Sequence, residues 1–520
     1  MRKPLTELSS YRALAAHFEE IELHTLRELF TQDKQRFSNF SVEFDGLLFD
    51  YSKNRINTTT IEKLIALFDE CAVPEWRDKM FSGEKINSTE SRAVQHAALR
   101  NLEDRESLLT KKQVAVLLLI EAFVEKVDQS NITDVVNIGI GGSHLGPLFV
   151  CDALQQYSKE NVNVYFVANV DAGEINNVLV DLNPENTLFI VTSKSFGTQE
   201  TLTNAKTARK WLSNNPGINI EDHFVAVTAN VKKAQQFGIA EDNIFPMWDE
   251  IGGRYSLWSA VGLSIALSVG IDAFKSLLKG AHAMDEHFIN QPANKNIPVL
   301  MALLDIWNQN FLKATTHAVL PYDIRFTYLP AYLQQLVMES NGKTVDREGN
   351  ALGCPSSQIW FGDVGTNAQH SFFQLLHQGK QNVSCDFIGV VKTTHDNQEQ
   401  HDMLLANMIG QTQALMMGQS LQEVGEDKHA EHKVFAGNRV SNTIFLKELT
   451  PYSLGMLLAM YEHRTFVQGV LLNINSFDQM GVELGKRLAN NLLEKIQDSE
   501  SVTDEDSSTN GLMNYYKTNK

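Results

Sequence analysis

Short apolar runs rich in β-branched residues alternate with amphipathic segments through most of the chain. Four of these runs lie in the first half, at residues 135–138, 162–167, 187–192 and 224–228. Segments whose apolar residues recur at helical spacing follow them, as at 145–156 and 198–212. Strands that alternate with helices are typical of a parallel sheet covered on both faces. We therefore expect an α/β lobe in this part of the chain.

A second set of alternating elements follows a long helical stretch that runs from about residue 255 to 310. We expect its strands at 314–319, 358–361, 383–391, 442–446 and 467–473, and its helices at 331–339, 366–377, 403–417, 452–461 and 479–495. An eight-fold α/β barrel is the competing architecture, but the helical stretch interrupts the alternation that a barrel needs. The pattern favours two doubly wound parallel-sheet lobes of similar plan.

The length of the chain also points to several domains, because 520 residues are too many for one compact core. We expect a helical N-terminal extension at 1–115, a first lobe at 116–285, a second lobe with a C-terminal helix at 286–498, and a tail at 499–520. The tail is polar and acidic, so we expect it to be solvated or partly ordered.

Composition narrows the class of protein. With 43% apolar and 21% charged residues, the chain has the make-up of a soluble globular protein. Its net charge of −18 argues against nucleic acid as a partner, although local donors can still bind a small anion. Four widely spaced cysteines form no CxxC pair, and the N-terminus lacks the apolar core of a secretory signal. The most membrane-like stretch, 255–271, is short and contains Ser and Gly, so we expect a packed core helix there and a cytoplasmic protein without membrane spans.

Two strand-to-helix turns have the residue types of an anion site. NIGIGGSHLGP (137–147) and SKSFGTQET (193–201) each follow a predicted strand. Glycine lets the backbone approach a ligand closely, and the hydroxyl and N–H groups at a helix start can surround phosphate oxygens. Simple helix capping by Ser and Thr is the alternative. The first turn fails the dinucleotide pattern GxGxxG at His144, and SNGKT (340–344) fails the P-loop pattern at Val337.

Six blocks then support one interpretation together. They are MFSGEKINSTESRAVQHAALR (80–100), GIGGSHLGP (139–147), DEIGGRYSLWSAVG (249–262), MESNGK (338–343), GTNAQHSF (365–372) and FDQMGVELGK (477–486). In these blocks and in their order, the chain closely resembles the glucose-6-phosphate isomerase family, from about residue 45 to 490. The resemblance implies two SIS-type (sugar isomerase) α/β lobes, usually as a homodimer. It also implies reversible interconversion of glucose 6-phosphate and fructose 6-phosphate through an enediolate, with no cofactor and no metal.

The resemblance further implies roles for individual residues. It makes Glu339 the base, His370 and Lys486 the ring-opening pair, and Arg254 the cation that stabilises the intermediate. His370 is expected to come from the partner subunit. Substrate contacts are expected from Gly142, Ser143, Ser193, Lys194, Ser195, Phe196, Gly197, Thr198, Gln335 and Gln479.

The chain departs from the usual family pattern at a few positions. His144 replaces a frequent aspartate, Ser195 and Gly197 replace frequent threonines, and Val440 replaces a common proline. Ser195 keeps a hydroxyl, whereas Gly197 leaves only its backbone N–H for a ligand.

The reaction itself explains why these residue types are needed. An aldose becomes a ketose when a proton moves between C2 and C1, and a carboxylate such as Glu339 can carry it, which is worth about 10²–10⁴ in rate. A fixed cation such as Arg254 offsets the negative charge of the enediolate oxygen. A histidine gains and loses a proton near neutral pH, which suits His370 to opening the sugar ring. Gln479 and Lys486 are seven residues apart, which would place them on one face of a predicted helix.

Other functions remain possible at this level. One is a non-catalytic sugar-phosphate sensor with the same fold, and another is an isomerase of a related sugar phosphate. Isomerisation by a metal-assisted hydride shift is disfavoured, because the densest candidate, EDKHAEHK (426–433), has the composition of a solvated charged loop.

Overall fold

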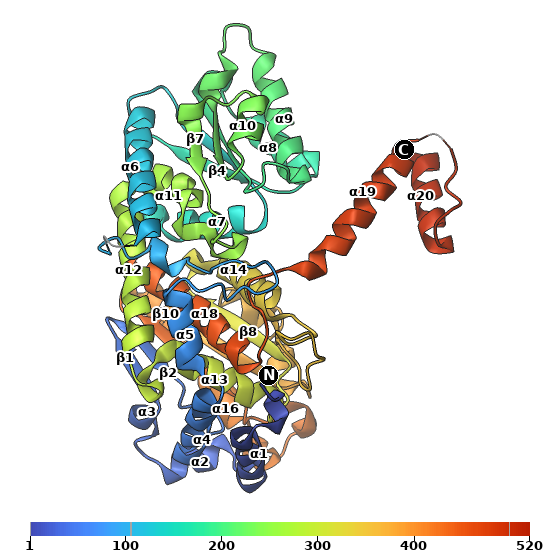
Figure 1. Ribbon diagram of the computed structural model, residues 1–520. Coiled ribbons are helices and arrows are strands. Elements are labelled where there is room, and N and C mark those ends of the chain that lie inside the picture. The colour runs from blue at the N-terminus through green and yellow to red at the C-terminus, as the bar shows by residue number, and fades with distance from the viewer. Residues whose placement is uncertain (1, 105–106, 499) are drawn as a thin grey trace. The chain divides into compact units, whose positions relative to one another are not determined.

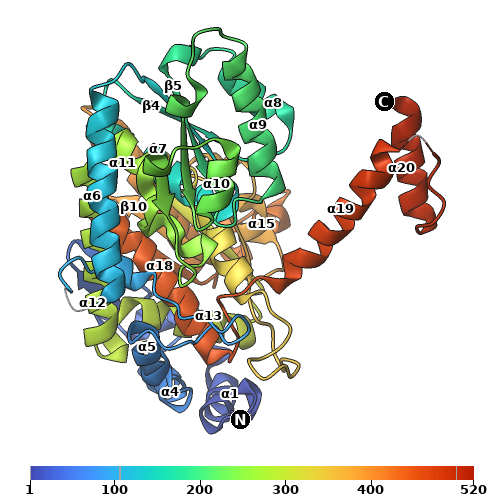
Figure 2. The same ribbon diagram turned by 45° about the horizontal axis from the view of Figure 1, so that its top comes forward.

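The computed structural model describes residues 2–104, 107–498 and 500–520. The chain divides into two compact units, Met1–Ser476 and Phe477–Lys520, and each is described by itself. Within its described residues, the first unit contains a five-stranded and a six-stranded sheet (Figures 1 and 2). The predicted α/β class with two largely parallel sheets is thereby confirmed.

The five-stranded sheet is parallel throughout, in the order β4-β3-β5-β6-β7. Its strands are β3 (Asp134–Ile138), β4 (Asn163–Val167), β5 (Thr187–Thr192), β6 (Phe224–Thr228) and β7 (Ile244–Pro246). All residues of β5 and β6 are buried, which explains why these strands read as unbroken apolar runs. Four of the five strands confirm the prediction, whereas the three-residue β7 carries too short a pattern to be recognised.

Helices pack on this sheet through small and aliphatic side chains. One core cluster joins alternate residues of β3, β5 and β6 to α8 (Ala172–Leu179), α9 (Gln199–Ser213) and α10 (Val231–Phe237). α8 and α9 lie side by side in both views (Figures 1 and 2). A second group consists of α6 (Leu108–Asp128), α7 (Leu145–Ala153) and α11 (Leu263–Val269), in which α11 contacts the other two.

The apolar stretch 255–271 is buried, as expected, but it is not one helix. It forms parts of two 3₁₀ segments, Gly253–Trp258 and Ala260–Gly262, followed by the short helix α11. Among the helices of the described ranges, we find none with the length and apolar character needed to cross a membrane.

The six-stranded sheet has the order β1-β2-β11-β10-β8-β9. Its strands are β1 (Ser41–Phe44), β2 (Leu47–Asp50), β8 (Thr316–Tyr322), β9 (Ile359–Gly362), β10 (Val383–Val390) and β11 (Ser441–Leu446). β11, β10, β8 and β9 are parallel to one another, whereas β2 runs antiparallel to both β11 and β1. The four parallel strands match four of the five that we predicted for this lobe.

The hairpin formed by β1 and β2 is a feature that we did not predict within the mostly helical segment 1–115. Its turn is Asp45-Gly46, and both residues have positive φ angles, 48° and 80°. An Asp-Gly pair with this backbone matches the twist of two antiparallel strands, so it is a strong hairpin signal. Because β2 pairs with β11, this N-terminal segment belongs to the sheet of the second lobe.

The predicted strand at 467–473 is wrong. Residues up to Leu471 belong to α18 (Pro451–Leu471), which packs along α12 (Ile271–Asn290) and α13 (Ile297–Asn310). Every α18 side chain from Ser453 to Leu471 is buried, and a helix buried all round has no amphipathic period to distinguish it from a strand. A Cβ on Gly455 would lie 2.0 Å from the Leu277 carbonyl oxygen, so only glycine permits this approach of α18 to α12.

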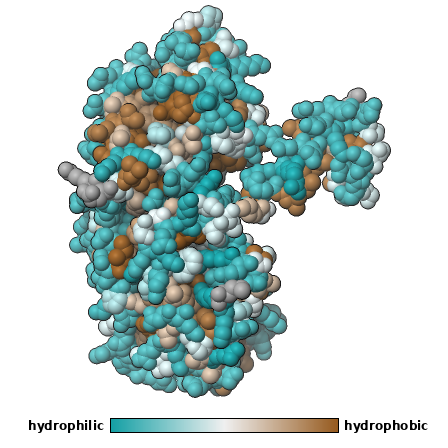
Figure 3. All heavy atoms as spheres, in the orientation of Figure 1, coloured by the Kyte–Doolittle hydropathy of each residue, from teal (hydrophilic) through white to brown (hydrophobic). Residues whose placement is uncertain are grey.

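The remaining helices of the first unit flank these two sheets. They are α1 (Ser9–Ile21), α2 (Leu26–Gln32), α3 (Arg36–Asn39), α4 (Thr58–Glu70), α5 (Val73–Phe81), α14 (Leu329–Leu333), α15 (Phe373–Gln378), α16 (Gln398–Met417) and α17 (Leu421–Val424). On the face shown in Figure 3, hydrophilic residues predominate and apolar residues form scattered patches.

The second unit contains helices α19 (Glu483–Gln497) and α20 (Ser507–Asn519). Lys495 near the end of α19 forms ion pairs with Asp504 (2.6 Å) and Glu505 (2.5 Å) in the connection between them. The side chain of Asp506 caps the start of α20 by accepting hydrogen bonds from two backbone N–H groups. The acidic tail, expected to be solvated or partly ordered, therefore contains a capped helix.

Candidate active site

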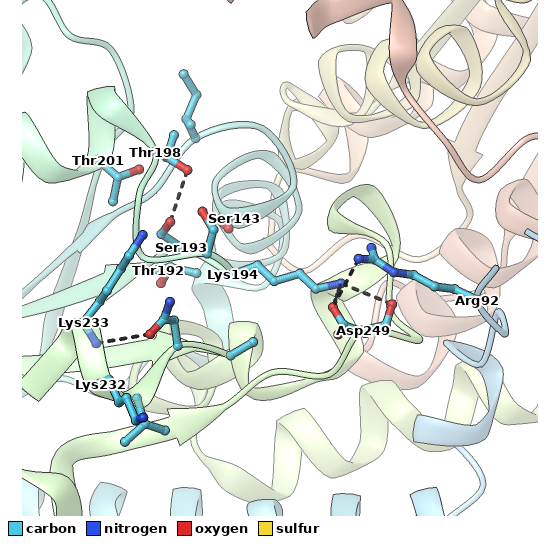
Figure 4. Close-up of a pocket in the computed structure, with 15 residues that line it drawn as sticks. Arg92, Ser143, Thr192, Ser193, Lys194, Thr198, Thr201, Lys232, Lys233 and Asp249 are labelled. Carbon is cyan, nitrogen blue, oxygen red and sulfur yellow. Dashed lines mark hydrogen bonds and ion pairs between the residues drawn. The ribbon is translucent and has the colours of Figure 1, made fainter. Parts of the chain in front are cut away.

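A cavity of about 840 Å³ lies at the carboxyl ends of β3, β5 and β6 (Figure 4). The turns that follow these strands line it, with Ser143 after β3, Ser193 and Thr198 after β5, and Lys233 after β6. The carboxyl ends of neighbouring parallel strands meet at one edge of a sheet, which is where α/β folds bind ligands. The two turns that the sequence singled out thus form one wall of one cavity.

The turn after β3 is held in place by its glycines. Gly141 has a φ of 61°, and a Cβ on it would lie 3.0 Å from Nε2 of Gln335. A Cβ on Gly142 would lie 1.9 Å from the carbonyl oxygen of Gly253, which is a backbone atom and not the end of a flexible side chain. Gly142 therefore lets this turn touch the segment that carries Arg254.

Polar side chains within the sheet tie the two turns together. The Asn137 amide donates to the Ser143 carbonyl (3.0 Å), and the Thr192 hydroxyl donates to the Asn137 side-chain oxygen (3.0 Å). Asn137 and Thr192 are both buried, so these bonds are shielded from water. They fix the distance between the hydroxyl groups of the two turns.

The turn after β5 presents hydroxyl groups to the cavity and packs one side chain, that of Phe196, into the core. The hydroxyls of Ser193 and Thr198 lie 3.1 Å apart, and Ser195 and Thr198 line the cavity with Ser193. Phe196 adopts a φ of 45°, and its side chain lies in the core cluster of the lobe at 2% exposure. Only the backbone of Phe196 is therefore placed to meet a ligand.

Lys194 lines the cavity, but its ammonium group is already engaged. It donates to the carbonyl oxygens of Asp249 (3.2 Å) and Ile251 (3.1 Å), and it lies 3.5 Å from the Asp249 carboxylate. Partial burial lowers the pKa of Lys194, an effect that Asp249 opposes and Arg92 reinforces. Lys194 thus connects the serine-rich turn to the segment that leads into Arg254 (Figure 4).

Arg254, Glu339 and Gln335 form a second cluster. Gln335 donates from Nε2 to Oε2 of Glu339 (3.0 Å), and Nη1 of Arg254 lies 3.8 Å from the same oxygen. Both Gln335 and Glu339 belong to a π-helical segment, Gln334–Glu339, which follows α14. The side chain of Glu339 is 25% exposed, so a ligand can reach a carboxylate that is held in place on one oxygen.

The guanidinium group of Arg254 is buried and firmly oriented. Its Nε donates to the Ser340 hydroxyl (2.6 Å), and its Nη2 donates to the Ser476 carbonyl (2.6 Å). The Ser340 hydroxyl also lies 2.9 Å from the hydroxyl of Tyr255. Arg254 is only 4% exposed, so these partners determine where its charge sits.

The three other predicted residues, His370, Lys486 and Gln479, belong to other elements of the chain. His370 ends a 3₁₀ turn, Asn367–His370, where it is exposed, and the described contacts of Glu339 do not include it. Lys486 belongs to α19 of the second unit and lies 3.2 Å from Glu483. Gln479 precedes α19, which begins at Glu483, so the prediction that Gln479 and Lys486 share a helical face is wrong. The backbone leaves the helical conformation at Gln479, a boundary that periodicity does not reveal.

Sequence reasoning missed several residues of these two clusters. Ser340 orients Arg254, and Asp249 and Arg92 surround Lys194. All three lie inside the blocks that identified the other site residues, but only their contacts show what they do. Lys233 had a signal that could have been used, because it follows β6 as the two predicted turns follow β3 and β5.

The chain is similar to several known proteins over most of its length. The phosphoglucose isomerase family model matches residues 50–513. A glucose-6-phosphate isomerase from Chlorobium phaeobacteroides is 49% identical over 541 residues, covering 99% of this chain and 97% of its own. The crystal structure of a glucose-6-phosphate isomerase from Chlamydia trachomatis has a TM-score of 0.89 at 32% identity and covers 100% of both chains. A hypothetical protein from Thermus thermophilus has a TM-score of 0.66 at 24% identity, over 86% of this chain and 99% of its own, and shows a shared fold.

Proposed function

Because the chain belongs to the phosphoglucose isomerase family and interconverts glucose 6-phosphate and fructose 6-phosphate, we propose that Glu339 is the base of this reaction. The observation that carries the proposal is the position of its carboxylate. One oxygen is held by Gln335 and faces Arg254, while the side chain as a whole stays open to a ligand. A base fixed in this way can take a proton from one carbon of the open-chain sugar and return it to the next.

Arg254 is proposed to stabilise the enediolate. Negative charge develops on a sugar oxygen when the proton leaves, and a preorganised donor at such an oxygen is worth about 2.7–4 kcal/mol. The bonds from Arg254 to Ser340 and Ser476 keep the guanidinium 3.8 Å from Glu339, beyond hydrogen-bonding distance. The base is thus not capped by the cation, and the cation needs no rearrangement when charge appears.

The cavity beside β3 and β5 is proposed to hold the phosphate group of the sugar. Hydroxyls of Ser143, Ser193, Ser195 and Thr198 line it and can donate to phosphate oxygens. The backbones of Gly142, Phe196 and Gly197 complete the proposed contacts, and Lys194 supports the turn through Asp249 and Ile251. Gln335 and Gln479 are proposed to bind sugar hydroxyls.

His370 and Lys486 are proposed to open the sugar ring, with His370 acting in the site of a partner subunit. The exposure of His370 and the apolar residues exposed on α16 and α19, such as Met403, Ile409 and Leu488, support a homodimer. A cytoplasmic location is also proposed, since all four cysteines carry free thiols.

The substitution Glu339→Gln tests the base. We expect kcat to fall by about 10²–10⁴ with little change in KM, because the amide keeps the shape of the carboxyl group but cannot accept the proton. Glu339→Asp is the matched control, since it keeps the carboxylate but retracts it, and we expect it to retain more activity than the amide. Activity is followed in a coupled assay in both directions, together with deuterium exchange from solvent into the sugar. Retention of more than about a tenth of the activity by Glu339→Gln would overturn the assignment.

Mixing two inactive variants tests the partner-supplied histidine. A hybrid dimer contains one Glu339→Gln subunit and one His370→Ala subunit, and therefore two active sites. If each site takes His370 from the partner subunit, one of these two sites combines an intact Glu339 with an intact His370. Random reassociation then restores about a quarter of the wild-type activity. If His370 acts within its own subunit, neither site of the hybrid is complete and mixing restores nothing.

A further inference from the structure

The ammonium group of Lys233 belongs to the edge of the cavity. Lys233 lies on α10, and among the described residues neither an ion pair nor a side-chain hydrogen bond engages its Nζ. In Figure 4 its side chain extends from α10 toward the turn that holds Ser193 and Thr198. The charge of Lys233 therefore faces the ligand space without a counter-ion from the described part of the chain.

Gly197 makes room for this ammonium group. A Cβ on Gly197 would lie 3.3 Å from Nζ of Lys233 and 3.5 Å from the Ser195 hydroxyl. A side chain at position 197 would therefore crowd the Lys233 ammonium group, which would have to shift by a few tenths of an ångström. The glycine, the lysine and the serine hydroxyl meet at one point of the cavity wall.

The charge of Lys233 can balance a bound phosphate group. A sugar phosphate is largely dianionic near neutral pH, and the hydroxyls of the two turns are neutral donors. Lys194 is bonded to Asp249 and Ile251, and Arg92 lies 3.7 Å from Asp249 and 3.6 Å from Glu90. Both cations are thus balanced by carboxylates, whereas Lys233 is not balanced by any described residue.

We propose that Lys233 binds the phosphate group of the substrate and that Gly197 gives it access. This inference rests on the proposed phosphate site, to which it adds a cation that no described carboxylate balances. The ammonium donates a charge-assisted hydrogen bond to a phosphate oxygen beside Ser195. The family resemblance leads one to expect a threonine at position 197. Here the ammonium group of Lys233 takes the place of that threonine's hydroxyl as a donor.

The substitution Lys233→Met tests the proposal, because it removes the charge and keeps the length of the side chain. We expect KM for both sugar phosphates, and the inhibition constant of inorganic phosphate, to rise by about fivefold to tenfold, a moderate effect because Lys233 is exposed to solvent. We expect kcat to stay within about twofold, since the phosphate is bound equally in the ground and transition states. Lys232→Met is the matched control, because Lys232 carries the same charge on the same helix and also lines the cavity, but its side chain points away from the turn that holds Ser193 and Thr198 (Figure 4). Equal effects of the two variants, or no effect of Lys233→Met, would overturn the proposal.

Two further arms separate this inference from the proposed phosphate site. Thr198→Val removes a hydroxyl of the turn itself. If inorganic phosphate inhibits this variant more weakly but inhibits Lys233→Met as strongly as wild type, only the role of Lys233 is refuted. Unchanged inhibition in both variants refutes the phosphate site as well. Gly197→Thr is compared in the wild-type and Lys233→Met backgrounds. We expect it to raise KM only where the lysine is present, and an equal effect in both backgrounds would contradict the pairing of Gly197 with Lys233.

Discussion

The orientation of Arg254 can be tested by removing the hydroxyl that fixes it. Ser340→Ala deletes the acceptor that lies 2.6 Å from Nε of Arg254 and leaves the Ser476 carbonyl and Glu339 unchanged. Ser340 is 0% exposed, so bulk water does not replace the lost hydroxyl. The guanidinium keeps its charge but loses one of the bonds that aim it.

The expected magnitude follows from the type of bond. A hydrogen bond to a charged group contributes about 1.5–3 kcal/mol, more than a bond between neutral groups. If Arg254 acts on the charge of the enediolate, this loss falls on the transition state. Each 1.36 kcal/mol corresponds to a factor of about ten in rate, so we expect kcat/KM to fall by about 10- to 150-fold.

The assay must separate misorientation of Arg254 from a general loss of stability. Ser259→Ala provides the comparison, since Ser259 is equally buried but its hydroxyl donates to the Ser256 carbonyl (2.6 Å) and not to Arg254. We expect both variants to lower Tm by a few degrees, and Ser340→Ala alone to lower kcat. A Ser340→Ala enzyme with kcat within twofold of wild type would refute the view that Ser340 positions Arg254 for catalysis.

Two further predictions concern the fit of the turns and the response to pH. Gly142→Ala places a methyl group 1.9 Å from the Gly253 carbonyl oxygen, so we expect it to lower both Tm and kcat/KM. Gly253→Ala is the control, because its Cβ would meet nothing within 4 Å, and we expect it to keep Tm within about two degrees of wild type. Equal melting temperatures of the two variants would contradict this reading of the contact. Glu70 accepts hydrogen bonds from the hydroxyls and backbone N–H groups of Ser10 and Ser9, and these bonds lower its pKa to about 2. The contribution of the ionised Glu70 to stability is fully present above its usual pKa and is lost as the pH falls toward 2. The difference in Tm between wild type and Glu70→Gln should therefore shrink over that pH range. A Tm difference that stays constant with pH would contradict the assignment.

Much of the fold could be predicted because its signals are local. β3, β4, β5 and β6 are short apolar runs closed by polar turns, and their buried positions explain this pattern. The errors arose where burial erases the pattern or where a turn decides it. α18 is buried on all sides and therefore shows no helical period, while the β1–β2 hairpin depends on the Asp45-Gly46 turn.

The site was predictable to a lesser extent, because motifs name residues but not their contacts. Lys194 lies in the serine-rich turn, yet its ammonium group serves the 249–251 segment instead of the open cavity. Phe196 lies in the same turn, yet its side chain belongs to the core. Neither fact follows from the order of residues, since each depends on an element that is distant along the chain.

The relation between Arg254 and Glu339 shows why these distant contacts matter for the chemistry. A base must keep its charge available for a proton, whereas an oxyanion donor must be close and immobile, and the two groups attract each other. A guanidinium that donated a hydrogen bond directly to the carboxylate would weaken both functions. The Ser340 hydroxyl and the Ser476 carbonyl are among the other partners of the guanidinium, and its ion pair with Glu339 is 3.8 Å long, which is longer than a hydrogen bond. Glu339 and Ser340 are adjacent in the chain, so the same backbone segment positions the base and restrains the cation, and a shift of that segment changes both together.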